Sequence, residues 1–200
     1  PLPLPLPLPL ILTLTLTWRE LRTYSDAALE ARGGRALAER VLAHAGCAGY
    51  LEATPGAMIP EHEAASVLRA LPACLPPDDA RAVARDAGAR TGGYILRHRI
   101  PGPAQLLLRA LPARLAAPIL LRAMAAHAWT FAGSGRVEIA PGRPARISIH
   151  ANPLAVPGCV WHCAVFEALF RRLVSARTAL REARCCARGA AACVFVIETG

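Results

Sequence analysis

The chain has 200 residues, of which 54% are hydrophobic and 18% are charged, and its formal net charge at pH 7 is +9. This composition excludes a wholly disordered chain and is sufficient for one sizeable core. All of the basic charge comes from arginine, and the arginines are scattered rather than clustered with aromatic residues, which argues against nucleic-acid binding. An anionic ligand or an acidic membrane surface fits this charge at least as well.

The first 17 residues form a low-complexity segment of repeated Pro-Leu followed by Ile-Leu-Thr-Leu-Thr-Leu-Thr. Proline at every second position prevents a helix, so this segment cannot be a transmembrane helix. It also lacks the basic start and the small-residue cleavage site of a signal peptide. We predict a disordered leader over residues 1–17, with an apolar tail that helps the protein reach a membrane as the alternative.

Helical patterns follow as far as residue 127. Gly46, Gly49, Pro55 and Gly56 mark a boundary near residues 47–57, which predicts a helical appendage over residues 18–47 and one domain over residues 48–200. Gly33-Gly34 weakens the first predicted helix. The predicted helices cover residues 25–45, 60–70 and 78–97, and two short helices between residues 103 and 127 that Pro112 separates.

Strand patterns dominate the remaining part of the chain. Residues 129–131 are rich in β-forming types, and residues 137–139 and 146–150 predict a strand pair around the turn at 141–144. Apolar residues at steps of three and four predict a helix over residues 159–174. Residues 182–185 and 191–198 predict a hairpin around Arg188-Gly189. The fold class that follows is α+β, in which N-terminal helices precede an antiparallel sheet with packed helices.

Three cysteines and one glutamate near the end of the chain have the spacing Cys-x22-Glu-x2-Cys-x7-Cys, at Cys159, Glu182, Cys185 and Cys193. Thiolate sulfur and carboxylate oxygen suit Zn²⁺, and four protein ligands leave no open position for a catalytic water. The pattern therefore indicates a structural zinc site. Cys159 would lie at a helix N-terminus, which lowers the pKa of a thiol.

Other roles for the cysteines stay open. Cysteine is often a small buried apolar residue, and Cys163 and Cys186 are alternative metal ligands. Cys186 is expected on the opposite strand face from Cys185. The odd number of cysteines, seven, argues against a disulfide framework.

Residues from about Ala48 to Glu198 resemble the bacteriochlorophyll-pathway 4-vinyl reductase family, whose C-terminal 4-vinyl reductase domain also occurs as a sensor in aromatic-responsive bacterial activators. The resemblance implies a ligand-binding fold of the NO-signalling/Golgi-transport type, and zinc-ligand roles for Cys159, Glu182, Cys185 and Cys193. The motifs that carry it are Met58–Glu63, Tyr94–Pro101, His127–Gly135, Asn152-Pro153 and the terminal Cys/Glu/Cys/Cys set.

The family name implies a divinyl (proto)chlorophyllide 8-vinyl reductase, an enzyme that normally needs a nicotinamide, flavin or iron–sulfur cofactor. Gly133-Ser-Gly135 is followed by a strand pattern and no third glycine, so it fails the dinucleotide fingerprint. We therefore favour a carrier or assembly factor that binds a Mg-porphyrin of the divinyl protochlorophyllide type. The 8-vinyl reductase itself is the first alternative, and a small-molecule sensor domain is the second.

The apolar helices between residues 103 and 127 offer a surface for a flat macrocycle, although ordinary core packing explains such residues equally. A histidine there could ligate a chelated magnesium, and an arginine could pair with a propionate. The candidate ligand-binding residues are His127, Trp129, Phe131, His98, Arg97 and Arg99, with Arg122 as a further arginine. We also expect a homodimer, contacts with other bacteriochlorophyll-pathway enzymes, and a cytoplasmic location peripheral to the photosynthetic membrane.

Overall fold

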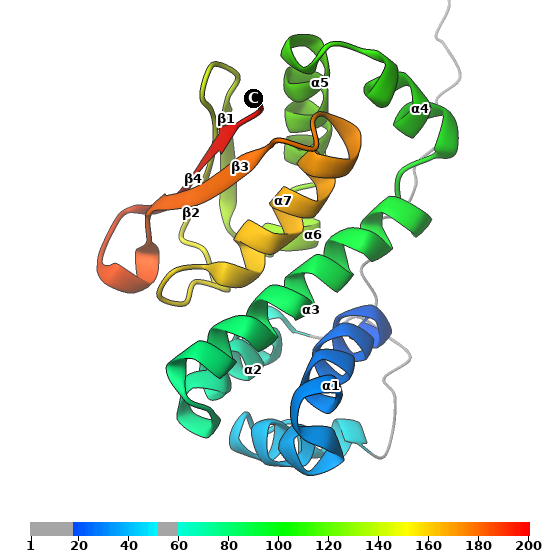
Figure 1. Ribbon diagram of the computed structural model, residues 1–200. Helices are drawn as coiled ribbons and strands as arrows, with labels where there is room; N and C mark the ends of the chain where they lie inside the picture. The colour runs from blue at the N-terminus through cyan, green and yellow to red at the C-terminus, as the bar shows by residue number, and fades with distance from the viewer. Residues whose placement is uncertain (1–17, 52–59) are drawn as a thin grey trace, which may run out of the picture.

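The computed structural model describes residues 18–51 and 60–200, with side chains from residue 28 onward. It confirms the α+β class: helices pack over a four-stranded antiparallel sheet with the strand order β1-β2-β4-β3 (Figure 1). The strands are β1 (Arg136–Ala140), β2 (Ala145–His150), β3 (Ala179–Arg184) and β4 (Ala192–Glu198). The leader over residues 1–17 and the Met58-Ile59 part of one motif lie outside the described residues.

One face of the sheet is apolar and faces the helices. Along β2, Ala145, Ile147 and Ile149 are buried while their neighbours are exposed or half-buried, as the two-residue period of a strand requires. Ile147 pairs with Phe195 and Ile149 pairs with Cys193 of β4. Because paired residues share a face of an antiparallel sheet, this register places the Cys193 side chain on the helix-covered side.

Successive helices form the layers behind this face. α5 (Ala113–Ala126) and α7 (Val160–Leu173) contact the sheet, α3 (Pro77–His98) packs along α7, and α1 (Trp18–His44) and α2 (Glu61–Cys74) pack on α3 (Figure 1). α3 approaches α7 closely at Gly88 and Gly92. A Cβ atom at Gly88 would lie 2.4 Å from the carbonyl oxygen of Trp161, and one at Gly92 would lie 2.7 Å from the Cβ of Ala168.

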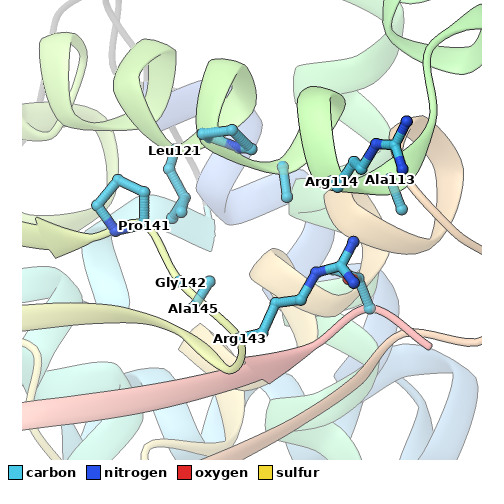
Figure 2. A pocket seen from close by; sticks show the side chains of 10 residues that line it. Ala113, Arg114, Leu121, Pro141, Gly142, Arg143 and Ala145 are labelled. Carbon is cyan, nitrogen blue, oxygen red and sulfur yellow. The ribbon is translucent and has the colours of Figure 1, made fainter.

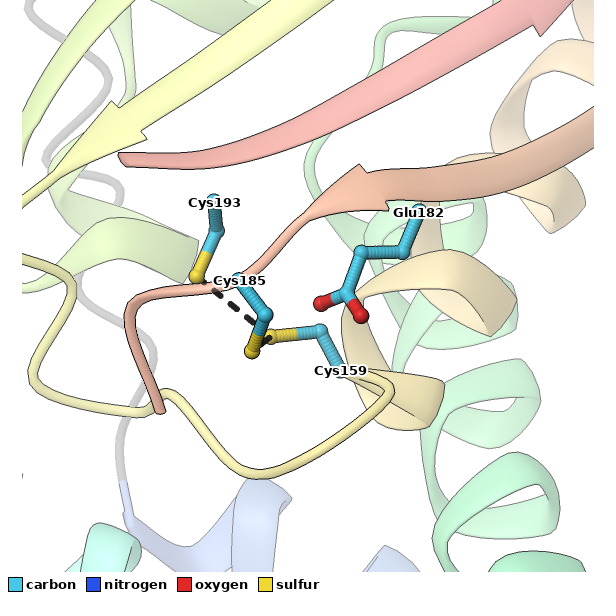
Figure 3. Close-up of side chains that lie close together, drawn as sticks. All are labelled: Cys159, Glu182, Cys185 and Cys193. Atoms are coloured by element: carbon cyan, nitrogen blue, oxygen red, sulfur yellow. Dashed lines mark hydrogen bonds between the residues drawn. The ribbon is translucent and has the colours of Figure 1, made fainter. Parts of the chain in front are cut away.

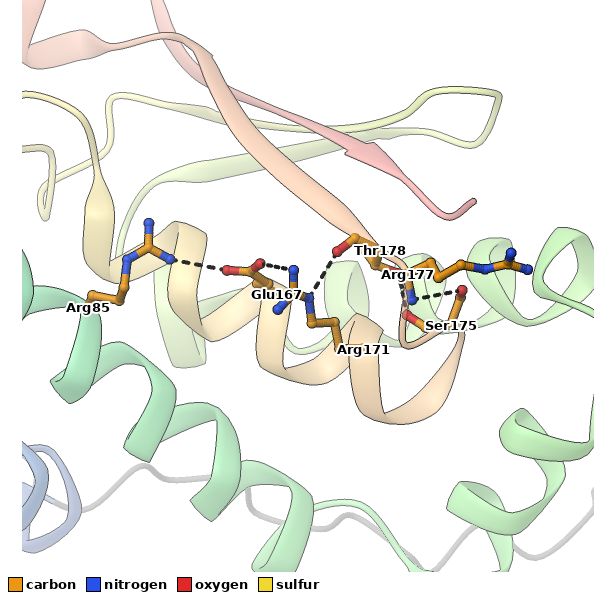
Figure 4. Close-up of polar contacts among 6 residues, drawn as sticks. All are labelled: Arg85, Glu167, Arg171, Ser175, Arg177 and Thr178. Atoms are coloured by element: carbon orange, nitrogen blue, oxygen red, sulfur yellow. Dashed lines mark hydrogen bonds and ion pairs between the residues drawn. The ribbon is translucent and has the colours of Figure 1, made fainter.

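Polar contacts fix both ends of α7 at its surface. Glu167 accepts from Arg85 of α3 (Oε2···Nη1, 3.2 Å) and from Arg171 (Oε1···Nη2, 2.8 Å). Arg171 Nε then donates to the carbonyl oxygen of Thr178 just before β3, at 3.0 Å (Figure 4). The three side chains therefore link α3, α7 and the start of β3.

Three phenylalanines and a histidine fill the centre between α7 and the sheet. Phe166 meets Phe131 and Phe195 edge-on, with ring centroids 5.1 and 5.2 Å apart, a favourable arrangement for aromatic pairs. His162 is fully buried beside them, and its Nε2 lies 3.0 Å from the carbonyl oxygen of Phe131. The pKa of His162 is lowered to about 4 because burial penalises the charged ring.

The predicted helices exist, with different ends. α1 continues from Trp18 to His44 with a kink at Gly34 (φ 67°), where the sequence predicted weakness. α2 ends at Cys74, and α4 (Gly102–Ala110) and α5 are separated at Pro112 as expected. No helix within residues 18–51 and 60–200 is long and apolar enough to cross a bilayer.

The β-prone segment at residues 129–131 is the main error in the secondary-structure prediction. It forms one helical turn, α6 (Trp129–Ala132), which ends at Gly133 (φ 55°). Thr130 Oγ1 donates to the carbonyl oxygen of His127 at 2.8 Å, and Phe131 is buried against Phe166. Tertiary packing and this local hydrogen bond therefore override the β propensity of Trp, Thr and Phe.

Candidate metal centre

Three sulfurs and one carboxylate meet where α7 begins beside the ends of β3 and β4. Cys159, Glu182, Cys185 and Cys193 each offer a ligand atom, and these atoms all lie within 4.8 Å of one another (Figure 3). The three cysteines are buried, with at most 2% of their surface exposed. The structure thus brings together the four residues that the spacing singled out.

The loop before α7 presents Cys159 through an uncommon backbone conformation. Gly158 has φ 89°, and Cys159 has φ 36° and ψ 41°, in the left-handed region. A non-glycine residue there costs about 1–3 kcal/mol and persists only where the surroundings enforce it. The Cys159 N–H donates to Val156 O at 2.9 Å, and Cys163 N–H donates to Cys159 O at 3.0 Å. These bonds fix Cys159 as the residue that precedes the first turn of α7.

The hairpin supplies the other three residues. Glu182 pairs with Phe195 of β4, and Cys193 lies two residues before Phe195 on the same face. The register shifts between Glu182 and Arg184, and β3 ends at Arg184. Cys185 therefore follows the strand, one residue short of the predicted strand end, and its Sγ points back to Val156 O at 3.3 Å.

The sulfur separations match a tetrahedral zinc site. Cys159 Sγ lies 3.8 Å from Cys185 Sγ and 3.6 Å from Cys193 Sγ. Two sulfurs bound at 2.3 Å to one tetrahedral zinc lie about 3.8 Å apart. A disulfide would require about 2.05 Å, so the arrangement fits a shared metal and all three thiols are free.

Glu182 supplies an independent sign that a cation fits the centre. Its Oε1 is buried and has no hydrogen-bond partner among the described residues. A buried carboxylate oxygen without a partner is costly, and a metal ion bound between it and the three sulfurs would satisfy it. The donor set of three thiolates and one carboxylate suits Zn²⁺, and with four protein ligands the site is closed.

The thiols of the metal-free cluster share charge unequally. Cys159 donates a hydrogen bond to Cys193, which raises the pKa of Cys159 together with burial. The same bond lowers the pKa of Cys193 to about 5, helped by the N–H of Cys186 at 3.3 Å and by the Asn152 side chain. The expected lowering of the Cys159 pKa at a helix N-terminus is therefore wrong, because its thiol is the donor in this pair.

The two alternative ligands lie outside the cluster. Cys163 is buried one turn into α7, and burial raises its pKa to about 12. Cys186 begins a short 3-10 turn, and its Sγ lies 3.8 Å from Ile149 O. Its backbone N–H, rather than its sulfur, reaches the centre.

The six candidate ligand-binding residues fall in two separate parts of the chain. His98 stacks on Tyr94 near the end of α3 (centroids 4.6 Å apart), and Arg99 lies over the same ring at 5.6 Å. His127 is exposed at the end of α5, and Trp129 is 39% exposed. The remaining two residues are Arg97, which is exposed, and Phe131, which packs in the core.

A groove beside the metal centre escaped the sequence reasoning. It has a volume of about 410 Å³ and lies between α2, α3 and the loop that leads into Cys159. Leu68, Val156 and Val160 give it apolar walls, and Arg69 and Arg81 also line it. The one sequence signal was the apolar Val156-Pro157 next to Cys159. The groove wall and the metal loop are the same segment.

The family model of the 4-vinyl reductase domain matches residues 150–199. This range contains all four residues of the metal centre. Cys159 is nine residues into the match and Cys193 lies near its end, so the matched region covers β2's last residue, α7 and the β3–β4 hairpin.

Two curated relatives match nearly the whole chain. The bacteriochlorophyll synthase 23 kDa chain of Cereibacter sphaeroides is 46% identical over 176 residues, which cover 84% of this chain and 82% of that protein. The bacteriochlorophyll synthase 23 kDa chain of Rhodobacter capsulatus is 37% identical over 175 residues, covering 85% and 81%.

Proposed function

The chain belongs to the family of the bacteriochlorophyll synthase 23 kDa chains, with a C-terminal 4-vinyl reductase domain, and from this we propose a role in bacteriochlorophyll synthesis. It acts as a carrier or assembly factor that binds a Mg-porphyrin intermediate of the divinyl protochlorophyllide type, in the branch that reduces the 8-vinyl group. The observation that carries this proposal is the identity of 46% across 84% of the chain.

The metal centre supports a stabilising role for zinc. Four protein ligands would complete the coordination, so substrate and water would find no open position. When bound, zinc would supply a link between the start of α7 and the β3–β4 hairpin. The chain's own residues then hold the loop 156–159 that forms one wall of the groove.

The loop at Gly133-Ser-Gly135 favours carrier over reductase. Ser134 donates from its N–H and from its hydroxyl to the two carboxylate oxygens of Glu61, at 2.6 Å each. A dinucleotide pyrophosphate needs such N–H groups free and is repelled by a carboxylate. The segment that most resembles a nucleotide loop is thus bound to an acidic side chain of the same chain.

We place the macrocycle against the exposed pair His127 and Trp129. Neutral imidazole is a suitable axial ligand for magnesium in a porphyrin, and the indole can stack on the ring. Arg97, Arg99 and His98 remain candidates for a propionate or a second contact, and Phe131 would support Trp129 from the core. The groove beside the metal centre is the alternative location.

Titration of the purified chain with divinyl protochlorophyllide, followed by absorption spectroscopy, tests the proposal. We expect binding, and we expect His127→Ala to shift the Soret band and to weaken affinity about tenfold, equivalent to about 1.4 kcal/mol. His44→Ala, an exposed histidine of α1, is the control. A bulky Val156→Trp substitution tests the groove, and an effect of this variant alone would move the site there.

Two further results decide between the remaining functions. Added NADPH should produce no 8-ethyl product, and turnover by the isolated chain would identify it as the reductase. Binding of small aromatic compounds without any affinity for tetrapyrroles would instead favour the sensor function that the resemblance to aromatic-responsive activators implies.

A further inference from the structure

The two helices α4 and α5 expose large apolar side chains to solvent at helical spacing. On α4, Pro103, Leu106, Leu107 and Ala110 are all exposed, at positions i, i+3, i+4 and i+7. Leu106 is 69% and Leu107 58% exposed, while Leu108 on the other side is 6% exposed. An apolar stripe of this spacing normally faces a core, yet here it faces outward.

α5 continues the pattern after Pro112. Leu115 is 48% and Ile119 43% exposed, and these residues lie one turn apart on the same side of the helix. The opposite side carries Ala116, Leu120 and Leu121, which are buried against the sheet and α7. We call the exposed side chains Leu106, Leu107, Leu115 and Ile119 the α4–α5 face. Soluble monomers rarely expose contiguous large apolar surface without a function.

The charge of this region has one sign. The sequence from residue 87 to residue 137 contains no aspartate or glutamate, although the whole chain has 14 acidic residues. The same stretch carries Arg109, Arg114 and Arg122 on α4 and α5, and all three are exposed. A face with exposed leucines flanked by unopposed arginines suits a surface that is apolar below and anionic above, which describes an acidic bilayer.

A small cavity extends the basic surface at one end of α5. It has a volume of about 230 Å³ and lies between the start of α5 and the β1–β2 turn, lined by Arg114 and Arg143 (Figure 2). Arg143 also lies beside Glu198, so the argument depends on the three arginines of α4 and α5. Arg114 and Leu115 are consecutive, which places the cavity next to the apolar stripe.

We propose that the α4–α5 face docks the protein on the surface of a membrane that contains anionic lipids. The leucines and Ile119 enter the headgroup region, and Arg109, Arg114 and Arg122 contact lipid phosphates. This contact is independent of tetrapyrrole binding and of zinc. It would bring the protein to the lipid surface in which an apolar pigment intermediate dissolves.

Co-sedimentation of the full chain with lipid vesicles tests the proposal. We expect binding to vesicles of phosphatidylglycerol mixed with phosphatidylcholine, weak binding to phosphatidylcholine alone, and release by high salt. Leu106→Glu with Leu107→Glu should lower the partition coefficient at least about tenfold. The control places the same two charges at exposed positions of α1, as Ala31→Glu with Ala36→Glu, and should bind like wild type.

A second variant separates charge from folding defects. Arg109→Gln, Arg114→Gln and Arg122→Gln together should weaken binding to anionic vesicles about tenfold, whereas Arg35→Gln, Arg40→Gln and Arg81→Gln should not. Equal binding by the leucine variant and wild type would overturn the proposal, as would equal binding to neutral and anionic vesicles. Conversion of a wild-type dimer to a monomer by the leucine variant, without any lipid binding, would assign the face to self-association instead.

Discussion

Cys159 shows how much of this fold depends on single residues. It is fully buried, adopts a left-handed backbone, and places its sulfur within 3.8 Å of two other thiols. Each property alone is unfavourable or neutral for a cysteine, since burial and the backbone conformation both cost free energy. A metal ion that joins the sulfurs to Glu182 would offset both costs.

Loss of one ligand should therefore remove the metal and much of the stability. Purified wild-type protein should contain about one zinc per chain. Cys193→Ser should abolish zinc in elemental analysis and lower Tm by about 10 °C, because metal binding is coupled to folding. Cys74→Ser, which changes a half-buried thiol outside the cluster, should alter neither quantity. Fully folded wild-type protein that holds no metal would contradict the prediction.

His162 should make stability depend on pH. Its folded-state pKa is about 4, below the value of about 6.5 for an unfolded histidine. The unfolded chain therefore binds the proton first, and the free energy of unfolding should fall by up to about 3 kcal/mol as the pH drops from 6.5 to 4. Urea denaturation at several pH values measures this. In His162→Phe the decline over that range should be smaller, and an identical pH profile would exclude His162 as its source.

Residue types and spacing were enough to predict the metal cluster, but not its details. Four ligands with a recognisable spacing can be found in the sequence, whereas the left-handed φ of Cys159 depends on Val156 and Gly158 folding around it. Phe131 illustrates the opposite limit. Its apolar character was evident, but only the packing against Phe166 places it in the core, while Trp129, two residues earlier, stays partly exposed.

At the scale of elements, the contact between α3 and α7 organises the helical layers. Gly88 and Gly92 lie one turn apart on α3, and the absence of side chains lets α7 come within contact distance of the α3 backbone. The sequence predicted both helices from their periodicity. Their pairing was not predictable, because a glycine inside a helical pattern only signals lower helix propensity until the partner helix is known.

A methyl group at Gly88 should separate these helices. Its Cβ would lie 2.4 Å from Trp161 O and 2.8 Å from Ala164 Cβ, so Gly88→Ala should lower the free energy of unfolding by about 1–3 kcal/mol. Gly93→Ala provides a matched control on the same helix. Its Cβ meets only the flexible Arg97 side chain, at 3.3 Å, and higher helix propensity should raise stability by up to about 1 kcal/mol. Similar effects of both variants in urea denaturation would refute close packing at Gly88.

The strand order and its ends divide in the same way. The hairpin and its strands were predicted from β-forming residues and turn signals, but β3 begins at Ala179 rather than Glu182 and ends before Cys185. The irregular register after Glu182 explains the difference. A two-residue periodicity cannot reveal such an irregularity, because it depends on what the strand must place beyond its end.

For the whole molecule, the helical layers are continuous from the sheet to α1. Leu29, Val41 and Leu42 of α1 are at most 2% exposed and pack with α2 and α3. Residues 18–47 were predicted as an appendage to a domain over residues 48–200. Their buried side chains indicate that such an appendage would still contribute to the free energy of unfolding of the domain it covers.

Truncation measures this contribution. A chain that starts at residue 48 would expose Val83 and Ala87 of α3, which are now at most 3% exposed, so we expect aggregation or a loss of cooperative thermal unfolding. A chain that starts at residue 18 removes only the predicted leader and should keep the wild-type Tm. A soluble, cooperatively folded chain over residues 48–200 with unchanged Tm would show that α1 is dispensable.

The short distances among Cys159, Cys185 and Cys193 have a consequence for the supply of folded protein. A ligand that binds only the native chain stabilises it by mass action, and above its dissociation constant each tenfold rise in free ligand adds about 1.4 kcal/mol. With zinc as that ligand, the folded fraction would follow the concentration of free metal in the cell. The amount of functional protein would then respond to zinc availability without any change in its synthesis.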